Sequence, residues 1–426
     1  MASYHEQSNV GTTLLEAVAD RIGIGLQQLM GSIKEGLLAM AVAVGLQVMQ
    51  RMMEEEVDQI VGTKGKHNSA RKTVRHGSEK RSVVLGGRKV VVDRPRVRTI
   101  DGREMRLETY EAFRDTKLLT QVAIERMLHG LSCRQYRYGL EPVGESISQF
   151  GTSKSAISRR FIQETRKALA ELMSKPIGPL NLVALFIDGV VLAGHTIVAA
   201  MGLDVGGQKH ILGLWEGATE NSALCKSLLS DLVCRGLRTD QPLLVVIDGS
   251  KALAAAVRDV LGKCAVVQRC QVHKKRNVLE HLPEDARVWV KRKLDQAYNE
   301  TDYVTAIGAL QTLASALGKE YPGAAASLRE GLEETLTVVR LGLPELLSYT
   351  LRSTNAIESV FERVKTVARN VKRWRSGEQV LRWTAAAALE AESRFHRIAG
   401  YRDIPLLIQA LRKEVLPDTS REVKTA

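Results

Sequence analysis

The sequence has few cysteines, no long apolar run and too few acidic residues to balance its basic ones. Five cysteines among 426 residues, at positions 133, 225, 234, 264 and 270, do not make a disulfide framework, so we expect a reducing, cytoplasmic location. The polar start Met1–Val10 lacks the pattern of a signal peptide, and the longest apolar stretch, Leu37–Leu46, is too short to span a bilayer. The sequence therefore predicts no membrane partner.

The excess of basic residues is concentrated in one short segment. The chain carries 61 Lys and Arg against 48 Asp and Glu, a net charge of +13, which favours a polyanionic partner. Between Val61 and Arg106 there are 14 basic and 4 acidic residues, and the alternation around Gly86-Gly87 predicts a β-hairpin. Such a basic ribbon suits phosphate contacts, although many charge runs are only solvated faces. The side chains expected to contact DNA here are Arg71, Arg75, Lys80, Arg81, Arg88, Lys89, Arg94 and Arg96.

Helical regions flank this basic segment. Residues Thr13–Val61 repeat apolar side chains at helical spacing, which is typical of packing or of a dimer surface. Within Lys117–Met173, residues Glu145–Phe150 and the segment from Ser153 have the pattern of a helix-turn-helix with a glycine at the turn. An ordinary helical hairpin has the same pattern. As a DNA-binding motif it would use Lys154, Ser155, Ser158 and Arg159.

Two apolar segments each contain or precede a single acid. The run Leu182–Leu192 predicts a buried strand that includes Asp188, and burying an ionised carboxylate is costly unless a partner or a metal compensates it. An Asp-Gly hairpin turn is the alternative interpretation. The strand Leu243–Ile247 is followed by Asp248 and by a helix that Ser250 caps. Asp248 is therefore expected at the carboxyl end of a strand, where open α/β sheets place their sites.

The order of the elements predicts the fold of this region. Further strands are expected at Thr196–Leu203, His210–Trp215 and Cys264–Arg269, and a helix at Ser222–Arg235. The resulting order, β-β-β-α-β-α-β, is that of a ribonuclease-H-like sheet, whose first and fourth strands are neighbours and would bring Asp188 and Asp248 together. Asp204 is a competing acid, but its Gly-rich turn explains it structurally.

The segment Gln268–Asn277 combines possible metal ligands with basic residues. Cys270 and His273 have the spacing of a metal-binding pair, yet a structural zinc needs four ligands and no second pair is near in sequence. We therefore expect no zinc, and a basic patch that presents His273, Lys274 and Arg276 to DNA. Residues Val278–Leu343 then predict an inserted helical subdomain.

A third acid, Glu358, lies at the rim of an amphipathic helix that begins near Ser353. A capping pair with Asn355 is a sufficient structural explanation for this acid alone. Jointly, Asp188, Asp248 and Glu358 meet the requirement for holding two Mg²⁺ or Mn²⁺ ions, which act together in displacement at phosphorus. The helix continues into basic residues, of which Arg369 and Arg373 are further expected DNA contacts.

These motifs, in this order, resemble those of bacterial Mutator-type insertion-sequence transposases, a group of Asp-Asp-Glu transposases. The resemblance extends from about Val48 to Lys372. It is carried by Gly130-Leu-Ser-Cys-Arg, Ser153-Lys-Ser-Ala-Ile-Ser-Arg, Phe186-Ile-Asp-Gly, Gly202-Leu-Asp-Val, Leu212-Gly-Leu-Trp-Glu, Asp231-Leu-Val-Cys-Arg-Gly, Val246-Ile-Asp-Gly-Ser, Gln268-Arg-Cys-Gln-Val-His-Lys-Lys-Arg-Asn and Thr354-Asn-Ala-Ile-Glu. It implies that Asp188, Asp248 and Glu358 are the catalytic, metal-binding triad, with Mg²⁺ or Mn²⁺ as cofactor. It also implies a bacterial, nucleoid-associated protein and a copy-out route through a circular intermediate.

The predicted fold class is therefore multidomain α/β (α+β), with a ribonuclease-H-like core interrupted by a helical insertion. The expected parts are a helical region 1–60, a basic β-containing segment 61–115, a helix-turn-helix domain 116–178, the core at 179–276 and 346–395, the insertion 277–345 and a tail 396–426. We expect an enzyme that cuts and joins double-stranded DNA at transposon ends and target, as a homodimer or larger. The alternatives are a structure-specific nuclease or resolvase of the same fold and a non-catalytic DNA-binding regulator.

Overall fold

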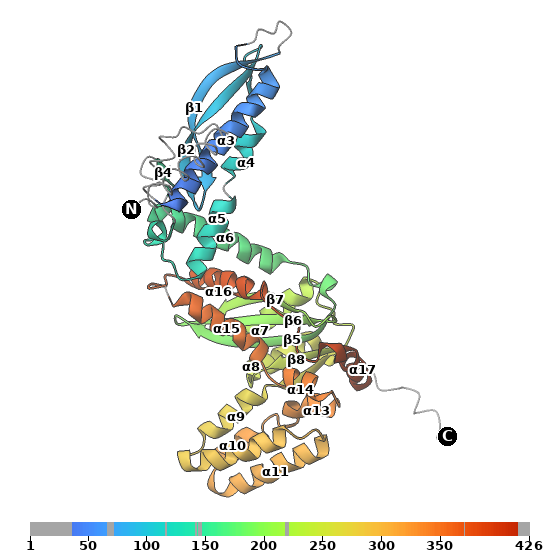
Figure 1. Ribbon diagram of the computed structural model, residues 1–426. Helices are drawn as coiled ribbons and strands as arrows, with labels where there is room; N and C mark the ends of the chain where they lie inside the picture. Colours follow the sequence, from blue (N-terminus) through green and yellow to red (C-terminus); the bar gives the residue numbers. More distant parts are fainter. Residues whose placement is uncertain are drawn as a thin grey trace, which may run out of the picture. The chain divides into compact units, whose positions relative to one another are not determined.

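The computed structural model describes residues 36–65, 72–115, 117–140, 143, 147–217, 221–369 and 371–415 (Figure 1). The chain divides into two compact units, Met1–Glu164 and Thr165–Ala426. The helix expected before residue 36, the DNA contact expected at Arg71 and the start of the expected helix-turn-helix lie outside the described residues. Among the described helices, none combines the length and the apolar character that crossing a membrane requires.

The first unit is built on the basic hairpin. Strands β1 (Thr73–Leu85) and β2 (Arg88–Thr99) pair antiparallel across Gly86 and Gly87, whose φ angles of 52° and 83° belong to the region that favours glycine. Helix α3 (Leu37–Val61) packs on the hairpin through the fully buried Met53 and Val57. The smaller elements are β3 (Glu104–Met105), α4 (Glu108–Arg114), α5 (Lys117–Leu128) and the 3₁₀ turn η1 (Tyr136–Gly139). The predicted hairpin is confirmed.

The structure corrects the predicted helix-turn-helix. Gln149 and Phe150 form a short strand, β4, that pairs with Lys89 and Val90 of β2 instead of ending a first helix. This pairing gives backbone partners to an edge of the hairpin, which a helix at the same position does not. The second predicted helix is present as α6 (Lys154–Ser174).

The second unit contains a five-stranded sheet in the order β7-β6-β5-β8-β9. Its strands are β5 (Leu182–Leu192), β6 (His195–Asp204), β7 (Lys209–Gly217), β8 (Leu243–Ile247) and β9 (Ala265–Arg269). The first three form an antiparallel meander, whereas β8 pairs parallel with β5 and β9 parallel with β8. The predicted strands and the predicted pairing of the first with the fourth are confirmed.

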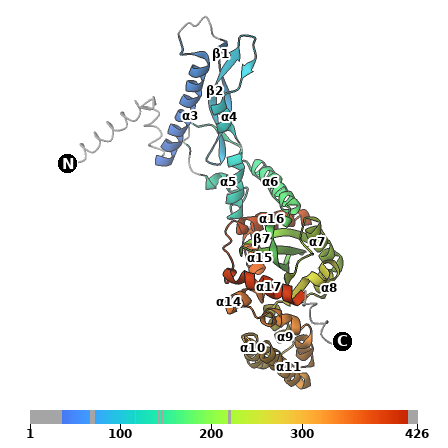
Figure 2. The same ribbon diagram turned by 90° about the vertical axis from the view of Figure 1, so that its right-hand side faces the viewer.

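Helices cover both faces of this sheet (Figure 2). Helices α7 (Ser222–Cys234) and α8 (Lys251–Leu261) pack on one face, in a core that includes Leu185 and Ile187 of β5. Helices α15 (Asn355–Ala368) and α16 (Gly377–Glu392) contact β5, β6 and β7. Because side chains alternate along a strand, Asp188 faces away from the Ile187 core and toward α15. The fold thus directs the buried acid toward the helix that carries Glu358.

The segment between β9 and α15, where the sequence predicts a helical insertion, is helical. The insertion follows α9 (Gln271–Glu280) and contains α10 (Glu284–Tyr298), α11 (Tyr303–Glu320), α12 (Pro322–Arg329), η4 (Glu333–Leu336), α13 (Thr337–Arg340) and α14 (Glu345–Leu351). These helices have their own apolar core, built mainly of Leu and Ala. The remaining elements are the 3₁₀ turns η2 (Gly178–Leu180), η3 (Gly262–Cys264) and η5 (Tyr401–Asp403), and helix α17 (Ile404–Val415).

Candidate active site

The two aspartates meet at the centre of the second sheet. In the parallel ladder between β5 and β8, Ile187 is the register partner of Ile247. Asp188 and Asp248 are the next residues on their respective strands, so both lie at the carboxyl end of β8 on neighbouring backbones. The Asp-Gly hairpin alternative is excluded, because β5 continues through Gly189 and turns only at Ala193 and Gly194.

Asp188 is almost completely buried, with 4% of its surface exposed. One carboxylate oxygen accepts a hydrogen bond of 2.8 Å from the backbone N–H of Gly189. Its pKa is raised to about 7, mainly by burial and also by the negative charges of Asp248 and Glu358, while the charge of His273 and the hydrogen bond from Gly189 oppose the rise. Ionisation of this carboxylate therefore calls for additional positive charge at the position where the three acids approach one another.

Asp248 is held by the turn that begins α8. Its Oδ1 accepts a hydrogen bond of 2.9 Å from the backbone N–H of Ser250, and the Ser250 side chain accepts from Leu253 N–H as the predicted helix cap. The guanidinium of Arg269 donates to the carbonyl oxygen of Gly249 at 2.8 Å. Both contacts fix the backbone on the C-terminal side of this acid.

Glu358 lies in the first turn of α15, whose apolar stripe is buried against the sheet as predicted. The capping pair with Asn355 is wrong, because Thr354 is the N-cap residue and Asn355 is already helical. The Thr354 hydroxyl instead donates a 2.8 Å hydrogen bond to Glu358 Oε1. The sequence hypothesis missed Thr354, although it stands in the Thr-Asn-Ala-Ile-Glu motif.

Each of the three acids uses one oxygen in these hydrogen bonds. Gly189 N–H, Ser250 N–H and the Thr354 hydroxyl bind Asp188 Oδ1, Asp248 Oδ1 and Glu358 Oε1 respectively. Within the part of the chain that the structure describes, no hydrogen bond reaches the second oxygen of any of them. Carboxylates arranged in this way are suitable ligands for hard divalent cations such as Mg²⁺, which bind a few carboxylates together with water and phosphate oxygens.

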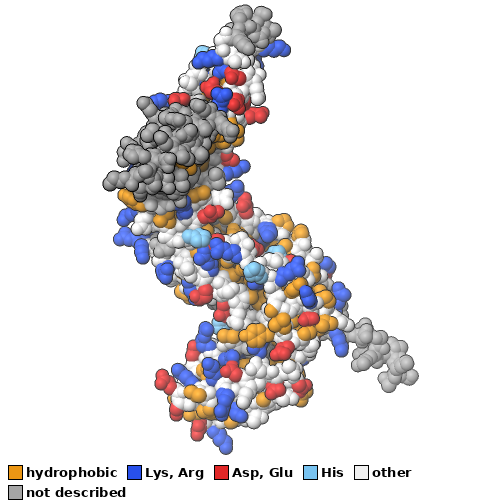
Figure 3. Space-filling view, viewed as in Figure 1, with side chains coloured by type: hydrophobic (Ala, Val, Ile, Leu, Met, Phe, Trp, Pro, Cys, Tyr) orange, Lys and Arg blue, Asp and Glu red, His pale blue; other side chains and the backbone are white. Residues whose placement is uncertain are grey.

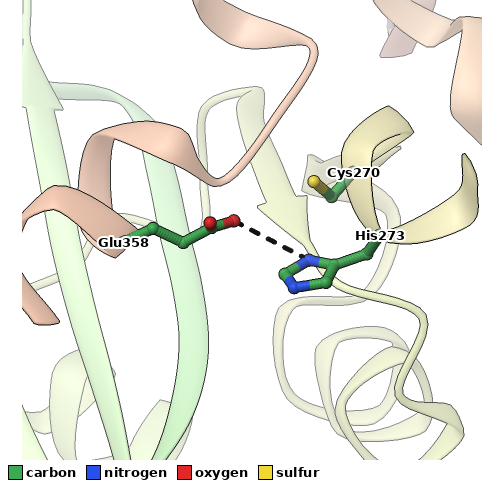
Figure 4. Close-up of side chains that lie close together, drawn as sticks. All are labelled: Cys270, His273 and Glu358. Atoms are coloured by element: carbon green, nitrogen blue, oxygen red, sulfur yellow. Dashed lines mark ion pairs between the residues drawn. The ribbon is translucent and has the colours of Figure 1, made fainter. Parts of the chain in front are cut away.

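The Cys270–His273 pair lies beside Glu358 (Figure 4). Cys270 follows β9, is buried and accepts a hydrogen bond of 3.4 Å from the backbone N–H of Thr354, and its sulfur is also 3.4 Å from the Thr354 hydroxyl oxygen. His273 Nδ1 is 3.4 Å from the Thr354 hydroxyl oxygen and 3.9 Å from Glu358 Oε1. The hydrogen bond with Cys270 raises the pKa of His273 to about 9, against the effect of its burial. At neutral pH the imidazole therefore brings positive charge to the acids.

Lys274 corrects the predicted basic patch. Its side chain is buried, and Nζ donates hydrogen bonds of 2.7 and 2.6 Å to the carbonyl oxygens of Ser327 and Glu330. Burial lowers its pKa to about 8. Lys274 therefore binds the insertion to α9 and is not available to DNA. Arg276, on the same helix, is exposed as predicted.

A glycine is required at position 331, where the insertion packs against Arg269 at the end of β9. Its φ is +60°, and an added Cβ would lie 2.0 Å from Arg269 Nη1, which donates to Glu330 O at 3.1 Å. We expect Gly331→Ala to lower the free energy of unfolding by about 2–3 kcal/mol, because it strains the backbone and displaces a buried guanidinium. Urea unfolding measures this loss. Gly342→Ala is the matched control, since Gly342 has a φ of +66° with no atom near the added Cβ, and an equal loss in both variants would contradict the contact with Arg269.

Several arginines of the basic hairpin are engaged within the first unit. Arg88 is buried and donates to Gln149 Oε1 at 3.0 Å. Arg94 is buried over the Tyr110 ring and pairs with Glu79 at 2.7 Å. These contacts correct the prediction that Arg88 and Arg94 bind phosphate, because their donors are withdrawn from solvent.

Other expected DNA contacts of the hairpin are also neutralised by acids. Arg75 pairs with Glu54 and Asp58 of α3, and Arg96 and Arg81 pair with Glu104 and Glu79. Lys80 is exposed and Lys89 is half-buried. The sequence count of charges did not anticipate that the acids of α3 and β3 lie against the hairpin.

The remaining expected DNA contacts are accessible. Lys154, Ser155 and Arg159 are exposed in the first turns of α6, where Ser158 is half-buried, and Arg369 and Arg373 are exposed after α15. On the face shown in Figure 3, basic side chains are interspersed with acidic ones and do not form a single patch. The exposed cations of α6 are therefore the sharpest test of nucleic-acid binding.

The chain is similar in sequence to known proteins. The family model described as "Transposase, Mutator family" matches residues 27–397. A transposase for insertion sequence element ISRM5 of Rhizobium meliloti (strain 1021) is 30% identical over 364 residues, which cover 83% of this chain and 88% of that protein. A transposase for insertion sequence element IS6120 of Mycolicibacterium smegmatis is 29% identical over 244 residues, covering 56% of this chain and 73% of that protein. A Drosophila P element transposase strand transfer complex is similar over 72% of this chain and 92% of that chain, with 11% identity and a TM-score of 0.29.

Proposed function

The chain belongs to the Mutator family of transposases, and we propose that it binds the terminal inverted repeats of its own element and catalyses metal-dependent strand cleavage and strand transfer. One observation carries this proposal. Asp188, Asp248 and Glu358 approach one another from β5, from the end of β8 and from α15, and each keeps one carboxylate oxygen outside any hydrogen bond of the described residues. Structural needs alone do not explain why two further acids gather beside the almost completely buried carboxylate of Asp188.

The sheet supports a ribonuclease-H-like core as the finer assignment. Its order β7-β6-β5-β8-β9, with an antiparallel meander followed by two parallel strands, is the order expected of that fold. The helical insertion lies between the second acid and the third, so it does not interrupt the sheet.

Asp188, Asp248 and Glu358 would hold two Mg²⁺ or Mn²⁺ ions. When bound, such ions activate an attacking hydroxyl and stabilise the leaving oxygen in an in-line displacement at phosphorus. The protein supplies three carboxylates, and one oxygen of each is held by a hydrogen bond. The donors are the N–H groups of Gly189 and Ser250 and the Thr354 hydroxyl. Because these supports are already in place, little ordering of the acids is needed when DNA arrives.

The proposed reaction has two displacements. In the first, water attacks a phosphodiester at the element's end, the P–O3′ bond breaks, and the departing oxygen takes a proton to become a free 3′-hydroxyl. In the second, that 3′-hydroxyl attacks another phosphodiester, a new P–O bond forms, and the displaced oxygen leaves with a proton. Since both ends of an element must meet for joining, we infer at least a dimer.

The test is cleavage and joining of a labelled duplex that carries the ends flanking this gene. With Mg²⁺ or Mn²⁺ we expect nicked and joined products from this duplex, and none from a duplex of equal length and composition with scrambled ends. Cutting without regard to end sequence would favour a structure-specific nuclease instead. Tight binding without metal-dependent cutting would favour a regulator that only binds DNA.

Lys154 and Arg159 on α6 are expected to contribute to DNA affinity through phosphate contacts. The double change Lys154→Ala and Arg159→Ala should reduce the magnitude of the slope of log affinity against log salt by about 2, since each phosphate contact releases about 0.9 of a counterion when it forms. Fluorescence anisotropy across a salt series measures the slope. Lys263→Ala is the control, because this exposed lysine precedes β9, at the opposite end of the strand from the acids. An unchanged slope in the double variant would remove α6 from the DNA interface.

A further inference from the structure

The proposed reaction uses Glu358 but gives no role to Cys270 and His273, which lie beside it. The ligand atoms of Cys270, His273 and Glu358 all lie within 4.8 Å of one another, in a group that does not include Asp188 or Asp248 (Figure 4). The sulfur distinguishes this group from a magnesium site, since hard cations take oxygen ligands while thiolate and imidazole select zinc-like metals.

The spacing of the donor atoms is close to that of a tetrahedral site. Bonds of about 2.0–2.3 Å from zinc to nitrogen, oxygen and sulfur place neighbouring ligand atoms about 3.3–3.8 Å apart. His273 Nδ1 is 3.9 Å from Glu358 Oε1. The Thr354 hydroxyl oxygen is 3.4 Å from both Cys270 Sγ and His273 Nδ1, as a fourth corner requires, whereas its 2.8 Å distance to Glu358 Oε1 is a hydrogen bond that metal binding would lengthen. Small side-chain movements would therefore bring three protein ligands and one hydroxyl or water around a cation.

Neither α9 nor α15 must move to assemble the group, because Gln271 N–H already donates to Arg352 O at 3.0 Å and ties the two ligand-bearing segments together.

We propose that Cys270, His273 and Glu358 form a binding site for a thiophilic divalent cation of the zinc class, with the Thr354 hydroxyl or a water as fourth ligand. Spacing along the sequence did not reveal it, because the third ligand lies beyond the whole helical insertion. The functional consequence rests on the proposed function. A cation held here occupies Glu358 and withdraws it from the Mg²⁺ ions, so zinc inhibits strand cleavage.

Metal binding to the purified full-length chain tests the site directly. After treatment with a chelator, the wild type should bind about one equivalent of Zn²⁺ in competition with a chromophoric chelator, and Co²⁺ should give the absorption band of a cobalt thiolate. Cys270→Ser should remove the cobalt thiolate band and weaken Zn²⁺ binding by at least about 100-fold. His273→Gln, which keeps the thiol, should weaken Zn²⁺ binding as well. Circular dichroism shows whether each variant is folded.

The controls separate this site from other thiols and from the catalytic acids. Cys234→Ser removes an exposed cysteine of α7 and should leave Zn²⁺ binding unchanged. Asp188→Asn should lose strand cleavage and keep the Zn²⁺ site, since Asp188 is not among its ligands. No thiolate band in the wild type, or equal Zn²⁺ affinity in folded Cys270→Ser, would overturn the proposal and leave the four side chains as a hydrogen-bonded network.

Inhibition is measured separately from binding. At fixed Mg²⁺, adding Zn²⁺ should lower the wild type's cleavage product over the same concentration range in which Zn²⁺ binds. Binding without any cleavage by the wild type would contradict the proposed function and leave the zinc site standing. If bound Zn²⁺ did not affect cleavage, the inference that Zn²⁺ withdraws Glu358 from the Mg²⁺ ions would be overturned.

Discussion

Replacing Asp248 with asparagine is expected to lower end-specific cleavage and joining by at least about 10³-fold, because losing one anionic ligand removes several kcal/mol of charge stabilisation at phosphorus. The fold should be retained. Asparagine has nearly the same shape, and its amide oxygen can accept the Ser250 N–H bond that Asp248 Oδ1 accepts at 2.9 Å. The change therefore removes a charge and little else.

A second acid-to-amide change shows whether this loss is specific. Asp204→Asn alters a carboxylate that accepts from Gly206 and Gln208 N–H and contacts His210 at 2.8 Å, in the turn between β6 and β7. We expect this variant to keep cleavage within about twofold, since the turn supplies no ligand to the site. Labelled-duplex assays of both variants, with anisotropy for DNA affinity, measure the difference. Cleavage by Asp248→Asn within tenfold of the wild type would refute the role given to this acid.

The aspartates were predictable because their strands are encoded locally. An apolar run interrupted by one acid at Asp188, and a similar run ended by Asp248 before a capped helix, define two neighbouring strands of a known order. Glu358 needed more than its own surroundings, because a helix cap explains a lone acid there equally well. Only the joint requirement for three carboxylates, together with the family resemblance, singled it out.

The errors came from contacts between segments distant in sequence. Gln149 and Phe150 form a strand because their backbone pairs with that of β2. The sequence around Gln149 and Phe150 does not indicate this pairing. Lys274 stands in a run of basic residues that is typical of an exposed patch, yet the carbonyl groups of Ser327 and Glu330 bury it. Arg94 is likewise removed from the basic ribbon by Glu79 and by Tyr110. Charge counting gives the sign of a segment but not which cations remain accessible.

Replacing Asp188 with asparagine is expected to make the metal-free protein more stable at pH 8 while abolishing cleavage. The pKa of Asp188 is raised from 3.8 to about 7 in the folded chain, so the folded state binds the proton more tightly than the unfolded state. Stability therefore falls as the pH rises from about 4 to about 7 and remains lower above that range. The full shift corresponds to about 4 kcal/mol, and an uncharged amide that still accepts from Gly189 N–H avoids this cost.

Chemical unfolding at pH 5 and pH 8, with and without Mg²⁺, separates this cost from other effects of the substitution. The advantage of Asp188→Asn over the wild type should grow from pH 5 to pH 8, because only the wild type must ionise a buried carboxylate. Mg²⁺ should reduce that advantage by stabilising the wild type alone, since a bound cation compensates the charge. If the stability advantage of Asp188→Asn changed with neither pH nor Mg²⁺, ionisation of Asp188 would not be the cause of the wild type's lower stability. The expected pattern would instead show that ionised Asp188 destabilises the folded chain and that a bound cation offsets this loss. That compensation is the physical basis for placing Asp188 in the catalytic site.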